Sequence, residues 1–485
     1  MVSKGDRAVV VGSGPNGLAA AVTLARAGVP VTVLEAHDTI GGGTRTAETA
    51  MPGVLHDVCS AIHPMAFASE FFRRFRLAEK VEFAVPEASY GHPLDGAPAA
   101  MAYRDLDRTA AELGRDGAAY RRFFRPLLHR LEGVLDFALG GSMLRVPRDP
   151  LAAAAMGLRT LEQGSPAWNL RFREEAAPAM ISGVAAHSIG AMPALSTGAV
   201  GLVLSAAGHA AGWPVPIGGS QRIAQALADD VLAHGGRIET GVRVGDVREL
   251  SDFAVKVFDT SARDLARIAA PELPAEYVRR LRRFRPGDAA AKVDLVLDGP
   301  IPWADPRLAR TPTVHLGGTR AQIAFAENEV RRGRHPDRPY VLLAQPDEFD
   351  PTRNPEGLHA VWSYTHVPNG STLDIRERVI AQIERFAPCV RDRIIAVNVV
   401  TASALGQYNP NYLGGDIAAG GVRLSQLLAR PTLSHAPWKT PTPGLYLASS
   451  STPPGPGVHG LSGWHAAKLA LSEVFGVRAE DVDLS

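Results

Sequence analysis

A glycine-rich turn close to the N-terminus has the spacing of a phosphate-binding loop. It lies between an apolar run at 8–11, typical of a buried strand, and an Ala- and Leu-rich segment at 18–27, typical of a helix. The three glycines permit a tight turn, close approach to a pyrophosphate, and close packing of helix on strand. The helix N-terminus offers free N–H groups to that pyrophosphate. The residues expected at this dinucleotide site are Gly12, Ser13, Gly14, Pro15, Asn16 and Gly17.

Glu35 ends the next expected strand, at 29–34, and stands eighteen residues after Gly17. A carboxylate at this point suits a ribose with a free 2′-hydroxyl. A second glycine patch at 41–43 would let another loop close over a long cofactor, which favours FAD over NAD. The sequence has no second glycine turn of this kind, so nothing in it supports a separate NAD(P)H domain. We therefore expect FAD, with further contacts from Glu35, Ala36, Gly42, Gly43, Thr44 and Arg45.

Two later segments complete a pattern seen in a known class of flavoproteins. The segment 216–247 starts with Gly218-Gly219 before an expected helix at 221–234 and strands over 237–247. The segment 443–463 has a short strand, a Pro/Gly-rich turn and an expected helix at 463–475. Together the three segments resemble, in order, the flavin-binding motifs of the phytoene-desaturase-like FAD-dependent oxidoreductases, in the glutathione-reductase and amine-oxidase class. The resemblance implies further cofactor contacts from Val244, Ser450, Gly460 and Leu461.

Within that class, the chain is most similar to the subgroup named for a pyridine nucleotide–disulphide oxidoreductase domain. Its two cysteines, Cys59 and Cys389, form no redox CxxC pair, so the dithiol chemistry of that name is not expected. Two positions depart from the family pattern. Gly43 stands where relatives often carry Arg, with Arg45 two residues later, and Ala448-Ser449 replaces a frequent Cys-Gly.

The order of elements predicts an α/β fold with a Rossmann-like FAD-binding domain assembled from discontinuous segments and an inserted α+β substrate domain. We expect the FAD-binding domain at 1–75, 206–272 and 436–485, and the substrate domain at 76–205 and 273–435. The first inserted segment reads as mostly helical. Its polar, Pro-rich joints are expected at 86–98 and 145–150. The second inserted segment has strand-like runs that predict an antiparallel sheet, at 292–297, 340–344 and 359–364.

Flavin chemistry asks the protein mainly to place a substrate C–H bond and to exclude water, so catalytic residues need not be conspicuous. His459 lies beside the C-terminal flavin motif and either moves a proton or bonds the backbone at a helix entry. His63, close to His56-Asp57, and Tyr364 are further candidates; loop packing and core packing are their alternatives. The polar loop at 409–416 bonds either a substrate or itself. No metal-ligand spacing is present, so no metal site is expected.

With a net charge of +1, the chain has no strong positive potential that would attract nucleic acid, so nucleic acid is not expected as a partner. The Arg-rich segments 120–125 and 279–283 are either solvated helix faces or surfaces that touch anionic lipid headgroups. The chain shows no signal-peptide core and no apolar run long enough to span a bilayer. A cytoplasmic protein follows, soluble or peripheral to a membrane; its oligomeric state stays open.

These observations predict an FAD-dependent desaturase or dehydrogenase. It would take hydride from a largely apolar, isoprenoid or alicyclic small molecule to flavin N5, with reoxidation by oxygen or a quinone. Three alternatives remain: a redox-neutral flavin isomerase, an FAD amine oxidase, and a non-enzymatic prenyl-lipid binding protein of the Rab GDP-dissociation-inhibitor kind. The intact glycine turn and Glu35 argue against the last of these.

Overall fold

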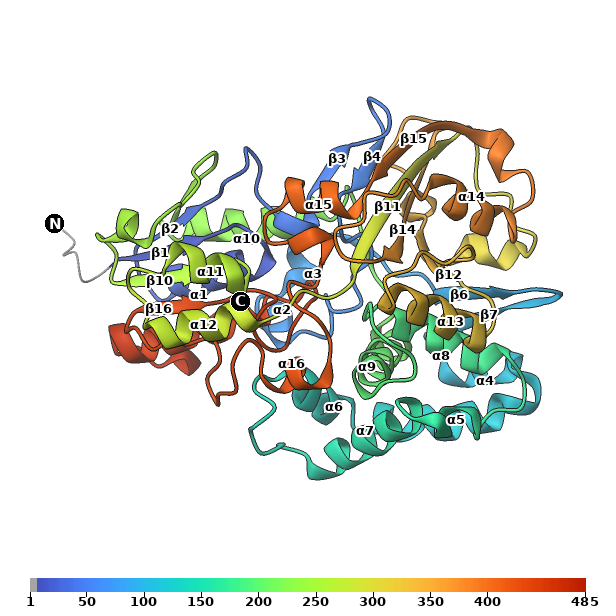
Figure 1. Ribbon diagram of the computed structural model, residues 1–485, viewed down its shortest axis with the longest axis horizontal. Helices are drawn as coiled ribbons and strands as arrows, with labels where there is room; N and C mark the ends of the chain where they lie inside the picture. Colours follow the sequence, from blue (N-terminus) through green and yellow to red (C-terminus); the bar gives the residue numbers. More distant parts are fainter. Residues whose placement is uncertain (1–6) are drawn as a thin grey trace.

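Two sheets organise the computed structural model, which describes residues 7–485 (Figure 1). The first sheet has five parallel strands in the order β16-β10-β1-β2-β9. These strands come from three separated parts of the chain, so the predicted Rossmann-like sheet built from discontinuous segments is confirmed, while the domain bounds given above stay a prediction. The strands are β1 (Ala8–Val11), β2 (Val31–Leu34), β9 (Arg237–Glu239), β10 (Val255–Phe258) and β16 (Leu445–Leu447).

Helices cover both faces of the parallel sheet. Side chains of β1 alternate between two cores: Ala8 and Val10 point to one, and Val9 and Val11 to the other. This explains why the strand is apolar at every position. On the first face lie α1 (Pro15–Arg26), α10 (Gln221–Ala233) and α17 (Leu461–Ala470); on the second lie α11 (Ala262–Ile268) and α12 (Ala275–Arg283).

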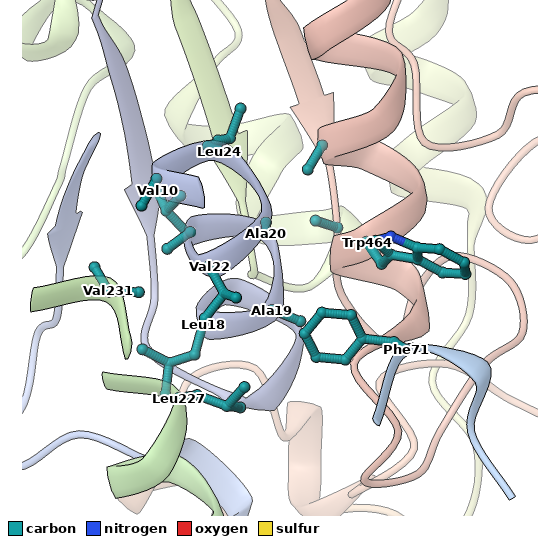
Figure 2. Packing of buried hydrophobic residues seen from close by; sticks show 14 of the residues in the cluster. Val10, Leu18, Ala19, Ala20, Val22, Leu24, Phe71, Leu227, Val231 and Trp464 are labelled. Atoms are coloured by element: carbon teal, nitrogen blue, oxygen red, sulfur yellow. The ribbon is translucent and has the colours of Figure 1, made fainter. Parts of the chain in front are cut away.

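Small residues let α1 and α17 pack closely. In Figure 2, Ala19 and Ala20 lie between the two helices, with Phe71 and Trp464 beside them. A Cβ at Gly463 would lie 1.7 Å from the carbonyl oxygen of Asn16, in the glycine-rich turn. Only glycine fits there, and this contact holds the C-terminal segment against the cofactor-binding turn of the N-terminal one.

The second sheet has seven strands in the order β15-β11-β14-β13-β12-β6-β7 and is antiparallel except between β12 and β6. The expected strand runs of the second inserted segment all belong to it, so the predicted antiparallel sheet is confirmed. Its strands are β6 (Ala88–Leu94), β7 (Ala97–Tyr103), β11 (Ala289–Leu297), β12 (Thr313–Leu316), β13 (Val341–Ala344), β14 (His359–Val367) and β15 (Ile394–Val400).

Two expectations about individual elements were wrong. The Pro-rich joint at 86–98 is the hairpin β6–β7, which turns at Asp95-Gly96, where Gly96 takes a φ of +67°. The strand expected through Val247 ends at Glu239; the loop after it hydrogen-bonds the end of β2 through the Val242 N–H and the Glu35 carbonyl, at 2.8 Å. The helix expected at 463–475 is confirmed: it begins two residues earlier, at Leu461, and its last turn, 471–475, is π-helical.

A layer of helices covers one side of the second sheet, as the helical reading of the first inserted segment predicted (Figure 1). On α5, Tyr120, Phe123, Phe124 and Leu127 point into the core, and the arginines between them point outward. No helix among residues 7–485 has the length and apolar character needed to cross a membrane. The layer consists of α4 (Leu106–Glu112), α5 (Gly117–His129), α6 (Leu131–Leu139), α7 (Pro150–Gln163), α8 (Ala176–Ala186) and α9 (Leu195–Ala211).

Short elements connect these layers. The hairpin β3–β4 and the pair β5–β8 are two-stranded sheets. The remaining strands and helices are β3 (Thr46–Glu48), β4 (Leu55–Asp57), β5 (Phe83–Ala84), β8 (Val215–Pro216), α2 (Glu70–Arg74), α3 (Leu77–Lys80), α13 (Arg320–Arg331), α14 (Arg376–Glu384), α15 (Ala402–Tyr408) and α16 (Leu424–Leu428).

Candidate active site

A cavity of about 770 Å³ joins the two halves of the molecule. One end lies where β1, β2 and β10 finish, the edge of a parallel sheet at which nucleotides bind. The other end reaches the helical layer beside the second sheet, at α7 and α9. Most of the predicted site residues line this cavity: Gly12, Ser13, Gly14, Pro15, Asn16, Glu35, Ala36, Gly42, Gly43, Arg45, His63, Val244, Tyr364, Ser450 and His459.

Four predicted cofactor residues lie outside the lining. Gly17 donates its N–H to Asp259 Oδ2 at 2.9 Å, and Thr44 Oγ1 donates to the Gly41 carbonyl at 2.8 Å. Gly460 is the residue from which α17 starts, and the Leu461 N–H donates to His459 Nδ1 at 3.0 Å. Thr44, Gly460 and Leu461 therefore shape the loops around the cavity.

The glycine turn has the form that a phosphate group needs. Gly12 takes a φ of +101°, and a Cβ on Gly17 would lie 2.2 Å from the Gly12 carbonyl oxygen. Pro15, the first residue of α1, has no N–H, and the Gly17 N–H donates to Asp259, so the N–H of Asn16, which lines the cavity, is the one left for a ligand in this first turn. Asn16 Oδ1 is buried without a hydrogen-bond partner among the described residues. The turn therefore fits the pyrophosphate of FAD.

Glu35 is fixed at the edge of the cavity. Its carboxylate accepts from Ser13 N–H at 3.0 Å and from His37 N–H at 2.8 Å, and it lies 3.2 Å from the guanidinium of Arg45. Because these partners hold both oxygens in place, the carboxylate is positioned in advance for the hydroxyls of a ribose.

The glycine at position 43 has a steric reason. A Cβ there would lie 2.6 Å from the Tyr412 hydroxyl oxygen, so an arginine at this position would require the Tyr412 side chain to move. Arg45 is 4% exposed and donates from Nε and from one terminal nitrogen to the Thr39 carbonyl, at 3.0 and 2.8 Å. Arg45 thus braces the loop and neutralises Glu35.

Asp259 is a cavity residue that sequence reasoning missed. It follows β10 directly, and its Oδ2 occupies the acceptor position at the N-terminus of α1, where it takes the Gly17 N–H. Burial raises the pKa of Asp259 to about 7, and the nearby Glu35 carboxylate adds to the effect. The strand-like run at 255–258, apolar except for Lys256, and the Asp259 that follows it were the available pattern, since a carboxylate follows the strand as Glu35 follows β2.

The structure gives His459 two backbone partners. Its Nε2 lies 3.1 Å from the Gly455 carbonyl, and its Nδ1 accepts the Leu461 N–H. Nε2 therefore carries the proton, and burial lowers the pKa of the ring to about 4. This geometry matches the alternative of a helix-entry histidine bonded to the backbone.

His63 and Tyr364 both face the cavity. His63 Nε2 lies 2.7 Å from Ser220 Oγ, its Nδ1 is buried without a partner among residues 7–485, and burial lowers its pKa to about 4. Burial raises the pKa of the Tyr364 phenol, and its ring packs edge-on against Trp362 with centroids 5.2 Å apart. Both side chains are neutral near pH 7, so each offers hydrogen bonds to a ligand.

A pair of histidines at the far end of the cavity was also missed. His187 lines the cavity, and its Nε2 lies 2.8 Å from Nε2 of the buried His315. Burial lowers the pKa of His187 to about 3 and that of His315 well below its usual value, so the two neutral rings share one proton along this bond. Since 128 residues separate them, no local pattern in the sequence could have shown the pair.

A buried ion cluster holds the loops behind the cavity. Arg353 contacts Asp57 at 2.6 Å and Asp350 at 3.4 Å, and all three side chains are fully buried. Asp57 also accepts the Ser220 N–H at 2.8 Å, and Asp350 accepts the Gly218 N–H at 2.7 Å. The cluster therefore ties the β3–β4 hairpin and the loop at 350–353 to the turn that precedes α10.

Asp347, Glu348 and His359 form a group of metal-ligand type, with ligand atoms within 4.8 Å of one another. His359 Nδ1 lies 3.1 Å from Asp347 and 3.5 Å from Glu348, and the hydrogen bond with Asp347 raises the pKa of His359. These contacts account for the group as an ion-paired cluster at the start of β14. That the chain uses no metal stays a prediction.

The sequence matches the family described as flavin containing amine oxidoreductase over residues 16–471. The chain belongs to this family. The resemblance stated from the motifs, FAD as cofactor and an FAD-dependent oxidoreductase are thereby confirmed. The match begins at Asn16, near the end of the glycine turn, and includes α17.

Individual relatives agree with the family. A rat protein, pyridine nucleotide-disulfide oxidoreductase domain-containing protein 2, is 26% identical and aligns with 96% of this chain and 93% of its own length. Hydroxyneurosporene desaturase of Cereibacter sphaeroides is 26% identical and aligns with 96% of this chain and 98% of its own length. A putrescine oxidase variant shares the fold with a TM-score of 0.60, 16% identity and coverage of 97% and 98%. Cyclohexylamine oxidase of Brevibacterium oxydans shares the fold with a TM-score of 0.55 and 16% identity, covering 98% of this chain and 99% of its own.

Proposed function

We propose that this FAD-dependent oxidoreductase takes hydride from a C–H bond of a largely apolar substrate, of isoprenoid or alicyclic type. When bound, FAD supplies a ring that accepts the hydride and later passes two electrons to oxygen or a quinone. The supporting observation is the far end of the cavity, which is continuous with the nucleotide end and lined by apolar side chains. Among them are Met156, Leu195, Val203 and Trp213. Such a chamber binds an apolar chain and excludes water. The similarity to a desaturase over the whole chain points the same way.

The position of the cavity's acidic residues argues against a cationic amine as substrate. Among the described lining residues the carboxylates are Glu35, Asp259 and Asp264. Glu35 and Asp259 follow strands of the parallel sheet, and Asp264 lies in α11 against that sheet. An ammonium group at the other end would therefore enter an apolar chamber without a counter-charge, which is costly.

Anaerobic spectroscopy of the flavin tests the proposal. We expect an apolar polyene precursor or alicyclic substrate to bleach the flavin absorbance, while putrescine and cyclohexylamine leave it unchanged. Bleaching by the amines alone would overturn the proposal in favour of an amine oxidase. Product formation without net bleaching would indicate a redox-neutral isomerase, and a purified protein without flavin would indicate a lipid-binding protein.

His187 is expected to orient the substrate for hydride removal, because its neutral ring faces the chamber and is held in place by the bond to His315. We expect His187→Gln to lower kcat about 100-fold, the size of loss that follows a substrate misplacement of about 1 Å, with little change in KM. The measurement is steady-state kinetics with a substrate that bleaches the flavin.

A surface histidine provides the control for His187. His335 bonds Ser371 Oγ at 2.8 Å and does not line the cavity, so His335→Gln should retain wild-type rates. Wild-type kcat in His187→Gln, with flavin content unchanged in both variants, would contradict this role for His187.

A further inference from the structure

Exposed apolar side chains gather on the helical layer beside the cavity. On α7, Leu158 is 66% exposed and Leu161 is 56% exposed, and their spacing places them on one face of the helix. Val146, in the loop between α6 and α7, is 85% exposed. Because monomeric proteins rarely expose a contiguous apolar surface of this kind, it indicates a binding face.

A second segment joins this surface from the other end of the chain. Leu424 and Leu428 of α16 are 47% and 43% exposed, and Leu433, which follows, is 64% exposed. A hydrogen bond of 2.8 Å from Ser142 Oγ to the Ser434 carbonyl ties this segment to the α6–α7 loop. Figure 1 shows α6, α7 and α16 together at the lower edge of the molecule. The apolar rim is defined here as Val146, Leu158, Leu161, Leu424, Leu428 and Leu433.

The apolar rim surrounds an opening of the cavity. Leu161 on α7 and Leu424 and Leu428 on α16 line the cavity and are also exposed on the surface. The chamber end of the cavity therefore communicates with the outside between α7 and α16. An apolar substrate that entered there would pass directly from the rim into the chamber.

Positive charge lies next to the rim. A groove lies between the C-terminal part of α5 and the start of α7. It is lined by Leu151 and by the basic residues Arg122, Arg125, His129 and Arg130. Residues 117–163 carry seven arginines against four acidic residues, whereas the whole chain has a net charge of only +1. Three of the four acids already pair with arginines of the same segment: Asp136, Asp149 and Glu162. The segment thus presents a cationic surface beside an apolar one, the combination that anionic bilayers attract.

We propose that this face docks on an anionic lipid bilayer, with the apolar rim inserted among the acyl chains and the arginines of α5 at the headgroups. The cavity then opens onto the bilayer, and a lipid-soluble substrate reaches the chamber without crossing water. The inference goes beyond the proposed oxidation. Vesicle binding is measured without turnover, so a failure of the membrane-docking proposal is distinguishable from a failure of the proposed oxidation.

Co-sedimentation of the holoenzyme with vesicles tests the proposal. We expect binding to vesicles of phosphatidylglycerol and phosphatidylcholine, weaker binding to pure phosphatidylcholine, and weakening by salt. The double variant Leu158→Glu/Leu428→Glu should lower the partition coefficient at least tenfold on both kinds of vesicle. Arg122→Glu/Arg125→Glu should remove the preference for the anionic vesicles.

Two matched variants serve as controls. Phe325 is 62% exposed on α13, a helix that carries no residue of the rim, so Phe325→Glu should bind vesicles as the wild type does. Arg279→Glu/Arg280→Glu changes the other arginine-rich helix, α12, and should also leave binding unchanged. Flavin absorbance and the thermal transition show that each variant is folded.

Two outcomes would overturn the proposal. The first is wild-type vesicle binding in the rim variant, or loss of binding only in the α12 variant. The second is a wild-type dimer in sedimentation velocity that the rim variant converts to a monomer, while wild-type protein binds no vesicles; the rim would then be covered by a second copy of the chain.

Discussion

Replacing Asp259 by asparagine is expected to tighten FAD binding about tenfold at pH 8. The carboxyl group of Asp259 takes the Gly17 N–H at the start of α1, where the fold leads us to expect the pyrophosphate. Two like charges about 4 Å apart repel by about 4 kcal/mol at an effective dielectric of 20, and screening reduces that figure. Asparagine keeps the acceptor oxygen for the Gly17 N–H but carries no charge. The measurement is the Kd of FAD by fluorescence titration of apoprotein.

The raised pKa of Asp259 makes the same repulsion depend on pH. With a pKa of about 7 in the apoprotein, the group is largely neutral below pH 7 and charged above it. If FAD binds the neutral form, binding takes up one proton, and the wild-type Kd rises up to tenfold per pH unit above pH 7. The Asp259→Asn protein should lack this rise. A wild-type Kd that is constant from pH 7 to 9, or weaker binding by Asp259→Asn, would contradict the assignment.

The stability of the apoprotein gives an independent check with a defined sign. The folded pKa of Asp259 is higher than the unfolded value of 3.8, so the folded state holds more protons between pH 4 and 7. The free energy of unfolding therefore falls as pH rises through this window, by at most about 4 kcal/mol at 1.36 kcal/mol per pH unit. Water in the cavity beside Asp259 reduces the fall. Asp259→Asn, measured by urea unfolding, should show a flatter profile.

The sequence was informative wherever the relevant residues are neighbours along the chain. Gly12, Gly14 and Gly17 and the nearby Glu35 predicted the nucleotide end of the cavity, because one βαβ unit positions all of them. The hairpin β6–β7 was missed since Pro93 and the small residues around it hide the alternation of a strand. The Asp95-Gly96 turn was its one clear indication.

Contacts between distant parts of the chain could not be predicted. Asp259 meets Gly17 across 242 residues, and Arg353 meets Asp57 across 296. Such pairs have no period or spacing that a single sequence displays. Asp57 precedes the candidate His63 by six residues, but its carboxylate is buried and bonds protein groups: Arg353, Thr46 and the Ser220 N–H.

The second large effect is expected from Arg353→Met. The substitution leaves the carboxylates of Asp57 and Asp350 buried without their counter-charge, which costs about 3–5 kcal/mol. The loss should also release the turn at 218–220 that both carboxylates hold. We therefore expect a lower urea midpoint and weaker retention of FAD, measured by unfolding curves and by flavin content after gel filtration.

The contribution of Asp57 to the pH dependence of unfolding should differ in sign between the wild type and Arg353→Met. Burial alone would raise the pKa of Asp57, but Arg353 and the hydrogen bonds lower it below its usual value. In the wild type this contribution to stability is present above pH 4 and is lost as pH falls through the folded pKa. Without Arg353, burial dominates and raises the pKa of Asp57, so stability should instead fall as pH rises above 4.

Two further variants distinguish the lost ion pair from a general packing defect. Arg353→Met/Asp57→Asn removes one of the stranded charges and should regain part of the lost stability, whereas a pure packing defect would only grow. Arg391 pairs with Glu377 at 3.0 Å on the surface, with 43% and 73% of the two side chains exposed. Arg391→Met should therefore change stability by less than about 1 kcal/mol. An equal effect of Arg353→Met and Arg391→Met would show that the buried cluster does not hold the turn before α10.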